Sequence, residues 1–478
     1  MVQWFDVMVR WCGCAGGEST LVKVVGRPWR RWLACAAAAA TLLLGAVEAD
    51  ALPSFARQTG LACSACHTNF PELTQFGRMF KVHGYTTLAV KDALEEKGTD
   101  KTAPLMVNRT FPLSVMFQTS FTRTNEQQPS TQNNDVEFPQ QLSIFLAGEI
   151  TPHIGTFLQA TYNGQDDHFS LDNTDIRYAN DAQVGGRELV YGVTVNNNPT
   201  VEDLWHTTPA WGWPFAAADS APTPDAAALV DGSLAQQVAG IGGYGFWDKH
   251  LYADVTLYRS AHIGSGQPPS VNDTDTIRDV APYWRLAWQQ GFGPNYLELG
   301  TFGMFAQLIP SGVSGATDKF TDLAFDAQYE RPLGADFLSA HATYIYENKQ
   351  LDATHSTGGS SNLSDKLHTF RLDGIYHWRS RVSGSLGYFL TRGNNDALLN
   401  APPDTTPGGP APVTGSANGS PDSDGVRFEL AYYPWQNVRL SAQYVAYTEF
   451  NGRANDYNGT GRNAESNDTF YLLAWLNY

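Results

Sequence analysis

The sequence predicts a mainly β protein, in which a membrane-spanning antiparallel barrel of about 16 strands follows a small α-helical N-terminal domain. Stretches beyond Thr110 alternate apolar and polar residues with a period of two, which indicates half-buried strands. Short turns alternate with long polar loops, as in outer-membrane barrels. The chain is 42% hydrophobic but has no internal apolar run of about 20 residues, which excludes a bundle of membrane-spanning helices.

Residues 1–51 are expected to be a signal peptide. Arg27, Arg30 and Arg31 precede an apolar run over residues 32–47, and small residues suited to cleavage follow. The basic region is long, so translation from Met8 or a later start is an open alternative. A membrane anchor is the other alternative, but the apolar run is short for a span. We therefore expect an exported protein.

The only cysteines after this leader form the sequence Cys63-Ser64-Ala65-Cys66-His67. Cys-x-x-Cys-His is the attachment motif of c-type haem, in which both thiols bind the haem vinyl groups and the histidine is the proximal iron ligand. The alternative is a thioredoxin-like redox pair, which would need a βαβ context that the flanking sequence lacks. We expect one covalent haem c on Cys63, Cys66 and His67.

Three alternatives stay open for the distal iron ligand: Met79, His83, or neither of these residues. Met79 and His83 are four residues apart, so they would share one face of a helix expected to begin at Pro71-Glu72 and end at Gly84. The helical domain is placed at residues 52–95 and a linker at 96–109. A domain this small rarely folds without a staple or a partner surface.

The barrel is placed at residues 110–478. An even number of strands would return both ends of the barrel to the periplasmic side. A soluble β-sandwich is the alternative, and it would bury its apolar faces in a core. Several aromatic residues fit interfacial girdles, and several charged residues fall on faces assigned to the lumen. The strand starts are expected near residues 110, 138, 155, 172, 187, 234, 250, 278, 295, 318, 336, 365, 382, 424, 437 and 466; the aromatics are Tyr283, Trp284, Trp378, Tyr433 and Trp435; the charges are Asp326, Glu330, Arg371, Asp373, Arg427, Glu429, Arg439 and Glu449.

Two segments around the haem motif carry a family resemblance. Residues 55–60 (FARQTG) precede the motif, and residues 76–81 (FGRMFK) with Gly84-Tyr85 follow it. This pattern resembles the fused outer-membrane cytochrome–porin family associated with ferrous iron oxidation, in which one c-type haem precedes a porin-like barrel of about this length. The resemblance implies haem attachment at Cys63 and Cys66 and ligation by His67. It carries over no separate iron site.

The loop over residues 196–213 is rich in Trp and Pro and contains Glu202, Asp203 and His206. We favour a constriction loop that folds into the barrel. An iron site is the alternative, because carboxylate and imidazole groups suit iron, although their spacing here is not diagnostic. An ordered surface loop without a ligand is the third interpretation.

We therefore expect an electron-transfer protein in the outer membrane of a Gram-negative bacterium, embedded in its lipid, with the haem domain on the periplasmic side or inside the barrel. Its partners would be extracellular Fe(II) or another reduced donor and a periplasmic cytochrome or other carrier. As an enzyme it would be a ferrous iron oxidase without acid–base catalytic residues. The alternative is a porin for small solutes with the haem module as plug or sensor. The net charge of −17 would repel nucleic acid and attract cations.

Overall fold

The computed structural model describes residues 54–86, 112–129, 131–261, 275–403 and 410–478. The chain divides into Met1–Asp50 and Ala51–Tyr478, and all described residues belong to the second unit. The expected signal peptide and the 96–109 linker lie outside the described residues. Their boundaries therefore stay predictions.

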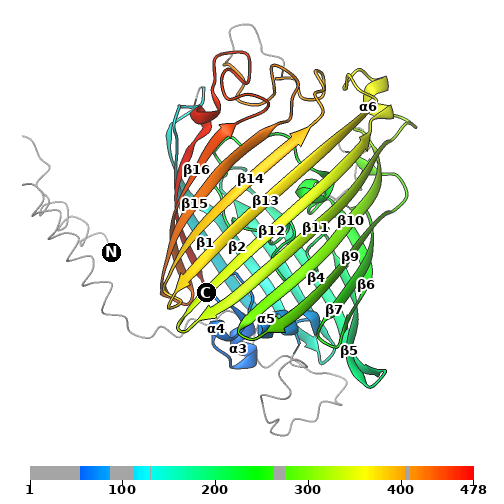
Figure 1. The fold of residues 1–478 in the computed structure, drawn as a ribbon, viewed down its shortest axis with the longest axis vertical. Coiled ribbons are helices and arrows are strands. Elements are labelled where there is room, and N and C mark those ends of the chain that lie inside the picture. Colours follow the sequence, from blue (N-terminus) through cyan, green and yellow to red (C-terminus); the bar gives the residue numbers. More distant parts are fainter. Residues whose placement is uncertain (1–53, 87–111, 130, 262–274, 404–409) are drawn as a thin grey trace, which may run out of the picture. The chain divides into compact units, whose positions relative to one another are not determined.

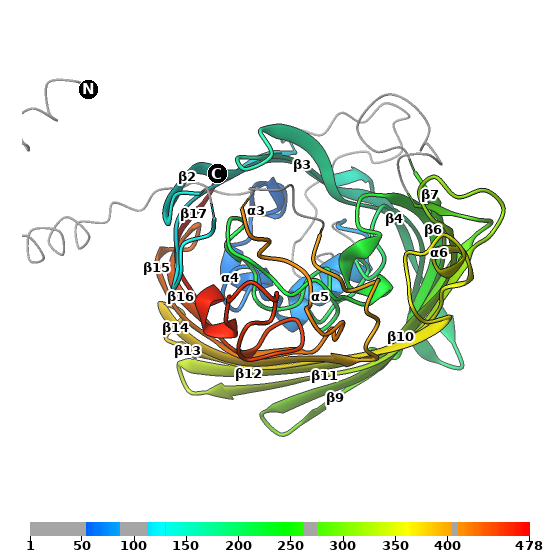
Figure 2. The same cartoon turned by 90° about the horizontal axis from the view of Figure 1, so that it is seen from above.

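The strands form one antiparallel sheet that closes on itself through pairing of β1 with β17 (Figures 1 and 2). Strand β8 is a two-residue piece beside β10, so sixteen long strands remain, as predicted. Each predicted start lies within four residues of the observed one. The strands are β1 (Leu113–Thr124), β2 (Asn134–Thr151), β3 (Ile154–Asn163), β4 (His168–Val184), β5 (Arg187–Asn196), β6 (Val238–Trp247), β7 (Leu251–Ser260), β8 (Thr276–Ile277), β9 (Ala281–Phe292), β10 (Asn295–Ile309), β11 (Asp318–Leu333), β12 (Asp336–Gln350), β13 (Ser364–Trp378), β14 (Val382–Gly393), β15 (Ser423–Trp435), β16 (Val438–Glu449) and β17 (Thr469–Asn477).

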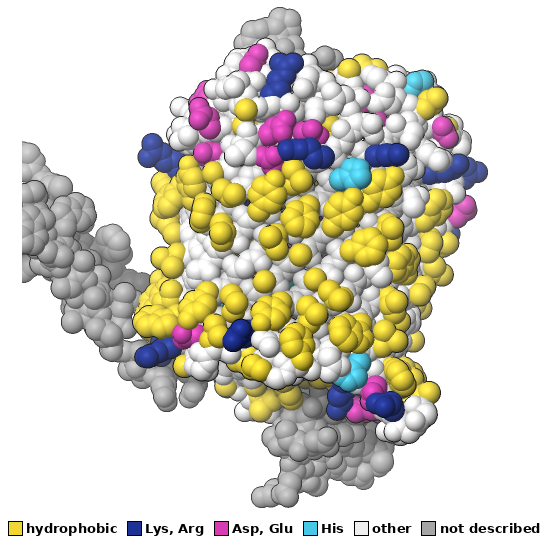
Figure 3. Space-filling model, viewed as in Figure 1, with side chains coloured by type: hydrophobic (Ala, Val, Ile, Leu, Met, Phe, Trp, Pro, Cys, Tyr) yellow, Lys and Arg dark blue, Asp and Glu magenta, His cyan; other side chains and the backbone are white. Residues whose placement is uncertain are grey.

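The strands turn their apolar faces outward. In β7, Val255 is 57% exposed, whereas the neighbouring Asp254 and Thr256 are buried. A soluble sandwich would show the opposite pattern, because water disfavours an apolar exterior. The face shown in Figure 3 carries a broad apolar belt between two polar rims. The barrel therefore spans a membrane with its strands, and its polar face lines the lumen.

The aromatic residues expected in the girdles divide between the two faces. Trp284 and Trp378 are exposed on the outside, as predicted. The prediction is wrong for Tyr283 and Tyr433, which are buried and therefore belong to the inner set. The reason is the pleat, since Tyr283 and Trp284 are consecutive and must point to opposite faces.

The two ends of the barrel differ in their connections. Short turns gather at one end and long loops at the other, where the short helices α6 (Asp352–Ser356) and η3 (Ala464–Asn467) lie (Figure 1). Outer-membrane barrels keep their short turns on the periplasmic side. Among the described residues, no helix has both the length and the hydropathy needed to cross a membrane.

The N-terminal segment, residues 54–86, lies inside the barrel at the short-turn end (Figures 1 and 2). It contains α3 (Ser54–Thr59), α4 (Cys63–Cys66) and α5 (Gln75–Val82). Helix α5 begins later than the expected Pro71-Glu72, because the Thr74 side chain accepts the Gly77 N–H and caps it. Gly84, with φ +69°, ends it as expected.

The loop between β5 and β6, residues 197–237, folds into the lumen. Its residues from Val201 to Thr208 are all buried. Its last part contains the helical turn η2 (Leu229–Ser233), which is held by carboxylates of β11 and β12: Asp322 accepts the Val230 N–H, and Glu347 accepts the Leu229 N–H. The lumen is thus occupied by the N-terminal segment and by this loop.

Candidate cofactor site in the barrel lumen

The Cys-x-x-Cys-His motif forms one turn of chain within the N-terminal segment. Cys63 and Cys66 are free thiols at the two ends of α4, and His67 follows directly. The His67 Nδ1 lies 2.9 Å from the Pro71 carbonyl oxygen. A carbonyl can only accept, so Nδ1 carries the proton and Nε2 is left with a lone pair. This is the tautomer that a metal-ligating histidine needs.

The motif lines a cavity of about 430 Å³ within the lumen. That volume lies in the range of small-molecule and cofactor pockets. Three parts of the chain supply its walls: the N-terminal segment, strands of the barrel, and the loop over residues 197–237, which we call the inward loop. Among the residues that line it are Cys63, Cys66, His67, Phe80, Met116, Phe145, Phe157, His206, Trp211, Phe215 and Trp475.

The chemistry of the two thiols fits covalent attachment better than a redox pair. Burial raises the pKa of both thiols, and that of Cys66 reaches about 11. A thioredoxin-like pair needs a lowered thiol pKa to expose a reactive thiolate. The donor set of two thiols, one oriented imidazole and an aromatic-lined cavity therefore fits a c-type haem.

A buried carboxylate ties the His67 loop to the barrel wall. Glu72 lies 2.6 Å from His377 Nε2, and Ser339 Oγ donates to it at 2.7 Å. Burial opposes ionisation of Glu72, but His377, His341 and the Ser339 hydroxyl outweigh it and lower its pKa to about 2. The glutamate is therefore ionised and anchored between β12 and β13.

Helix α5 is held by two buried cations. Arg78 makes a bidentate pair with Glu330 of β11 at 2.6 and 3.0 Å, with both side chains under 8% exposed. Lys81 Nζ donates to the carbonyl oxygens of Val201 and Asp203 at 2.8 and 2.6 Å. Each cation is thus paired or hydrogen-bonded, as burial requires. Arg78 fixes α5 to the wall, and Lys81 fixes it to the inward loop.

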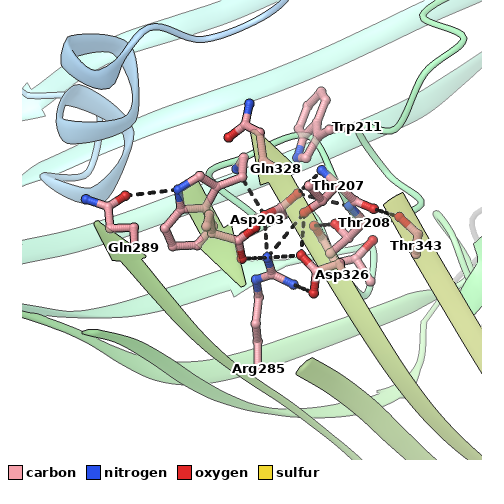
Figure 4. A network of polar contacts seen from close by, with 12 residues as sticks. Asp203, Thr207, Thr208, Trp211, Arg285, Gln289, Asp326, Gln328 and Thr343 are labelled. Atoms are coloured by element: carbon pink, nitrogen blue, oxygen red, sulfur yellow. Dashed lines mark hydrogen bonds and ion pairs between the residues drawn. The ribbon is translucent and has the colours of Figure 1, made fainter. Parts of the chain in front are cut away.

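The inward loop is fixed in turn by a charge network around Arg285 of β9 (Figure 4). Arg285 Nη2 lies 2.7 Å from Asp326, 3.2 Å from Asp203 and 3.3 Å from Glu298. Asp203 also accepts the backbone N–H groups of Trp205, Thr207 and Thr208 at 3.0–3.1 Å. The prediction that the 196–213 loop constricts the pore agrees with this inward course. Asp203 therefore has a structural role that its sequence position did not reveal.

Glu202, Asp203 and His206, the weak candidates for an Fe(II) site, do not gather around one point. Among the described residues, only His83, Asp181 and Glu188 form a group of three whose ligand atoms lie within 4.8 Å of one another. Both carboxylate oxygens of Glu202 are buried without a hydrogen-bond partner in the described chain, and burial raises its pKa. Burial and the nearby Lys81 lower the pKa of His206 to about 3, so its imidazole is neutral.

The two predicted distal ligands lie away from the cavity. Met79 packs against a cluster that includes Val82, Leu204 and Trp205, and it is not among the residues that line the cavity. The His83 Nδ1 lies 2.7 Å from the Met79 carbonyl, and its Nε2 lies 3.1 Å from Asp181 at the short-turn end. The structure brings Cys63, Cys66 and His67 together with His206 instead.

Sequence reasoning missed the residues that anchor the segment. The sequence analysis placed Glu72 at the start of the expected helix and gave Arg78 and Lys81 no structural role. Their partners are 252, 120 and 267 residues away along the chain. The only signal was indirect: a segment too small to fold alone needs a partner surface.

A closed barrel with an apolar exterior, a polar lumen and short turns at one end defines a porin-like outer-membrane β-barrel. No family model matches the chain, and no curated protein matches it. Solved structures with a similar architecture include OmpT of Vibrio cholerae (11% identity, TM-score 0.42), the channel DcaP of Acinetobacter baumannii (10%, 0.43) and an anion-selective porin from Comamonas acidovorans (9%, 0.43). Each match covers 77% of this chain and 96–98% of the other. These likenesses are too remote to carry an argument about function.

Proposed function

We propose that the protein carries one covalent c-type haem inside its barrel and transfers single electrons between an extracellular donor, Fe(II), and a periplasmic carrier. The observation that carries the proposal is the position of the Cys63-x-x-Cys66-His67 motif, which lines a cavity in the lumen rather than a surface outside it. Electrons need a redox centre within the membrane's depth, because hydrocarbon about 30 Å thick separates the two sides.

Haem bound at this motif supplies a one-electron couple. The chain's own residues supply position and environment. The Pro71 carbonyl holds the proton of His67 on Nδ1 and leaves the Nε2 lone pair free, so His67 is the residue that would hold the iron. Glu72 and Arg78 lock the segment against β11–β13, and the aromatic walls keep the site of low polarity. Burial and the residues that hold the iron would set the potential of the bound haem.

Fe(II) is proposed as the donor because of the family resemblance and the excess of acidic residues. A net charge of −17 raises the concentration of cations near the protein. Electron transfer from Fe(II) needs no acid–base residues. As an enzyme, the protein would be a one-electron ferrous iron oxidase that passes each electron to a periplasmic cytochrome.

A solute porin is the second candidate. The width of a sixteen-stranded barrel and its polar lumen favour it, because barrels of this size leave an aqueous channel. In that case residues 54–86 act as a plug. The inward loop and the N-terminal segment occupy the lumen of the described chain, which favours a closed barrel over an open channel.

The test compares Cys63→Ala/Cys66→Ala and His67→Ala with a matched histidine control, His250→Ala, at a turn away from the cavity. We expect the cysteine variant to lose covalent haem by mass spectrometry and both site variants to lose Fe(II) oxidation. All three should assemble as heat-modifiable barrels. Fe(II) oxidation by haem-free protein would contradict the proposal, and haem-independent solute flux into liposomes would support the porin alternative.

A further inference from the structure

A second histidine, His206 of the inward loop, lines the same cavity as Cys63, Cys66 and His67. We propose that His206 is the second axial ligand of the haem iron, so that the barrel loop and the N-terminal segment each supply one imidazole. The inference rests on the proposed function, since it requires haem at the motif. It changes the assignment of the sixth position from Met79 or His83 to a residue of the barrel.

The His206 ring makes no hydrogen bond that would occupy its nitrogens within the described chain. Its side chain is buried, with 6% of the residue exposed, and neither ring nitrogen has a hydrogen-bond partner in the described chain; Nδ1 is fully buried. Buried polar atoms are nearly always satisfied, because an unpaired one keeps the cost of its lost hydration without a compensating hydrogen bond. A neutral imidazole that is buried and unpaired at the wall of a cavity is the form that binds a metal.

The backbone at His206 is held in a position that few side chains adopt. Its φ is +61°, in the left-handed region. Such a conformation is strained for a side chain other than glycine and persists only where the surroundings fix it. Asp203 fixes it here, because its carboxylate accepts N–H groups on both sides of His206, from Trp205 and Thr207, and is itself paired with Arg285. The inward loop therefore holds the backbone of His206 in a fixed position.

Aromatic side chains fix the orientation of the ring. Trp211 lies nearly parallel to it, with ring centroids 6.0 Å apart and an interplanar angle of 25°. Phe215 meets it edge-on at 6.2 Å. Both aromatics line the cavity. They contact the imidazole ring and form no hydrogen bond with its nitrogens.

Lys81 couples the two halves of the site. It extends from α5 to the carbonyls of Val201 and Asp203, three to five residues before His206. Helix α5 is in turn packed on the motif, since a Cβ added to Gly77 would lie 2.2 Å from the Cys66 carbonyl oxygen. The elements that carry the two histidines are therefore tied to each other and not only to the barrel.

Met116 of β1 is the competing ligand. It lines the cavity, and its sulfur accepts a weak hydrogen bond from Gln118 at 3.6 Å. A thioether ligand would raise the haem potential, whereas a second imidazole would lower it. The two ligands also differ in the near-infrared and visible spectra of the ferric protein, so they can be told apart without any substitution.

The first experiment is electron paramagnetic resonance and near-infrared magnetic circular dichroism of the ferric wild-type protein. We expect a low-spin, bis-imidazole signal. A thioether charge-transfer band would overturn the assignment and point to Met116. Wild-type protein without covalent haem would overturn the proposed function itself, so the two failures are distinguishable.

The second experiment compares His206→Ala and His206→Met with the controls His83→Ala and Met79→Leu. We expect His206→Ala to keep its covalent haem, lose the low-spin signal and regain it when imidazole is added. His206→Met should show a thioether band and a higher potential. The two controls should keep the wild-type spectrum. An unchanged low-spin spectrum in haem-loaded His206→Ala would overturn the inference.

Discussion

The barrel and the N-terminal segment inside it are built on opposite principles. Each long strand of the barrel pairs with neighbours on both sides, and β17 closes on β1, so its backbone needs nothing from the segment. The segment consists of three short helices whose own apolar cluster, Phe55, Leu61, Phe76, Phe80 and Tyr85, already includes Phe157 from the barrel wall. Polar ties from Glu72, Arg78 and Lys81 supply the rest.

This difference shows that different interactions specify the two parts. The barrel is specified by alternation along its own strands, whereas the segment takes its fold from the lumen. The barrel should therefore survive changes in the segment, and the segment should not survive changes in its ties.

Deletion of residues 54–86 should have the largest effect. We expect the barrel to assemble and its conductance in planar bilayers to rise severalfold, because a sixteen-stranded lumen is wide enough for water once the segment is gone and only the loop over residues 197–237 still narrows it. Heat-modifiable migration on gels reports assembly, and the wild-type conductance is the control. If the deletion variant failed to assemble, the barrel would depend on the segment, contrary to this account.

Arg285→Ala should detach the inward loop. It leaves Asp203, Asp326 and Glu298 buried without their shared cation, which costs about 3–5 kcal/mol for a broken buried pair. We expect new protease cleavage within residues 197–237 and a lower midpoint of urea unfolding. Equal protease resistance in wild type and Arg285→Ala would show that the network does not hold the loop.

Glu72→Gln should loosen the segment while leaving the barrel closed. Removal of the charge beside His377 should cost about 3 kcal/mol of the segment's docking. Because the pKa of Glu72 falls to about 2 in the folded protein, from an ordinary value of about 4.3, docking should be complete above about pH 5 and weaken as the pH falls toward 2. Limited proteolysis of residues 54–86 across this pH range measures how much of the segment is docked. A cleavage rate that does not change with pH would contradict the role of ionised Glu72 in anchoring the segment.

Arg187→Ala should have the smallest effect and serves as the matched arginine control. Arg187 pairs with Asp248 at a turn, with its side chain 58% exposed. Such surface pairs contribute about 0.2–1 kcal/mol. We expect the urea midpoint and loop proteolysis to match wild type. A shift as large as that of Arg285→Ala would mean that burial does not distinguish the two sites.

Periodicity was sufficient to predict the barrel. In Leu251–Ser260, for example, apolar and polar residues alternate, and a period of two predicts a strand and fixes which side chains share a face. A local motif was sufficient to predict a site for haem attachment, because such a site needs only Cys63, Cys66 and His67 close together in sequence; the haem itself stays a prediction.

The interior of the lumen could not be predicted in the same way. Nothing local marks Glu330 as the partner of Arg78, or His206 as a wall of the cavity that holds His67, because these contacts join residues more than 100 positions apart. Met79 and His83 were chosen by helical spacing alone. Spacing gives the face of a helix but not what that face meets, and α5 turns Met79 toward Trp205 and Val82.

The most direct test of the central claim is stopped-flow visible spectroscopy of purified, detergent-solubilised, oxidised protein mixed with Fe(II) under anaerobic conditions. We predict prompt growth of the absorption bands of reduced c-type haem. Absence of reduction by Fe(II), while dithionite still reduces the haem, would contradict the claim that this barrel takes electrons from ferrous iron.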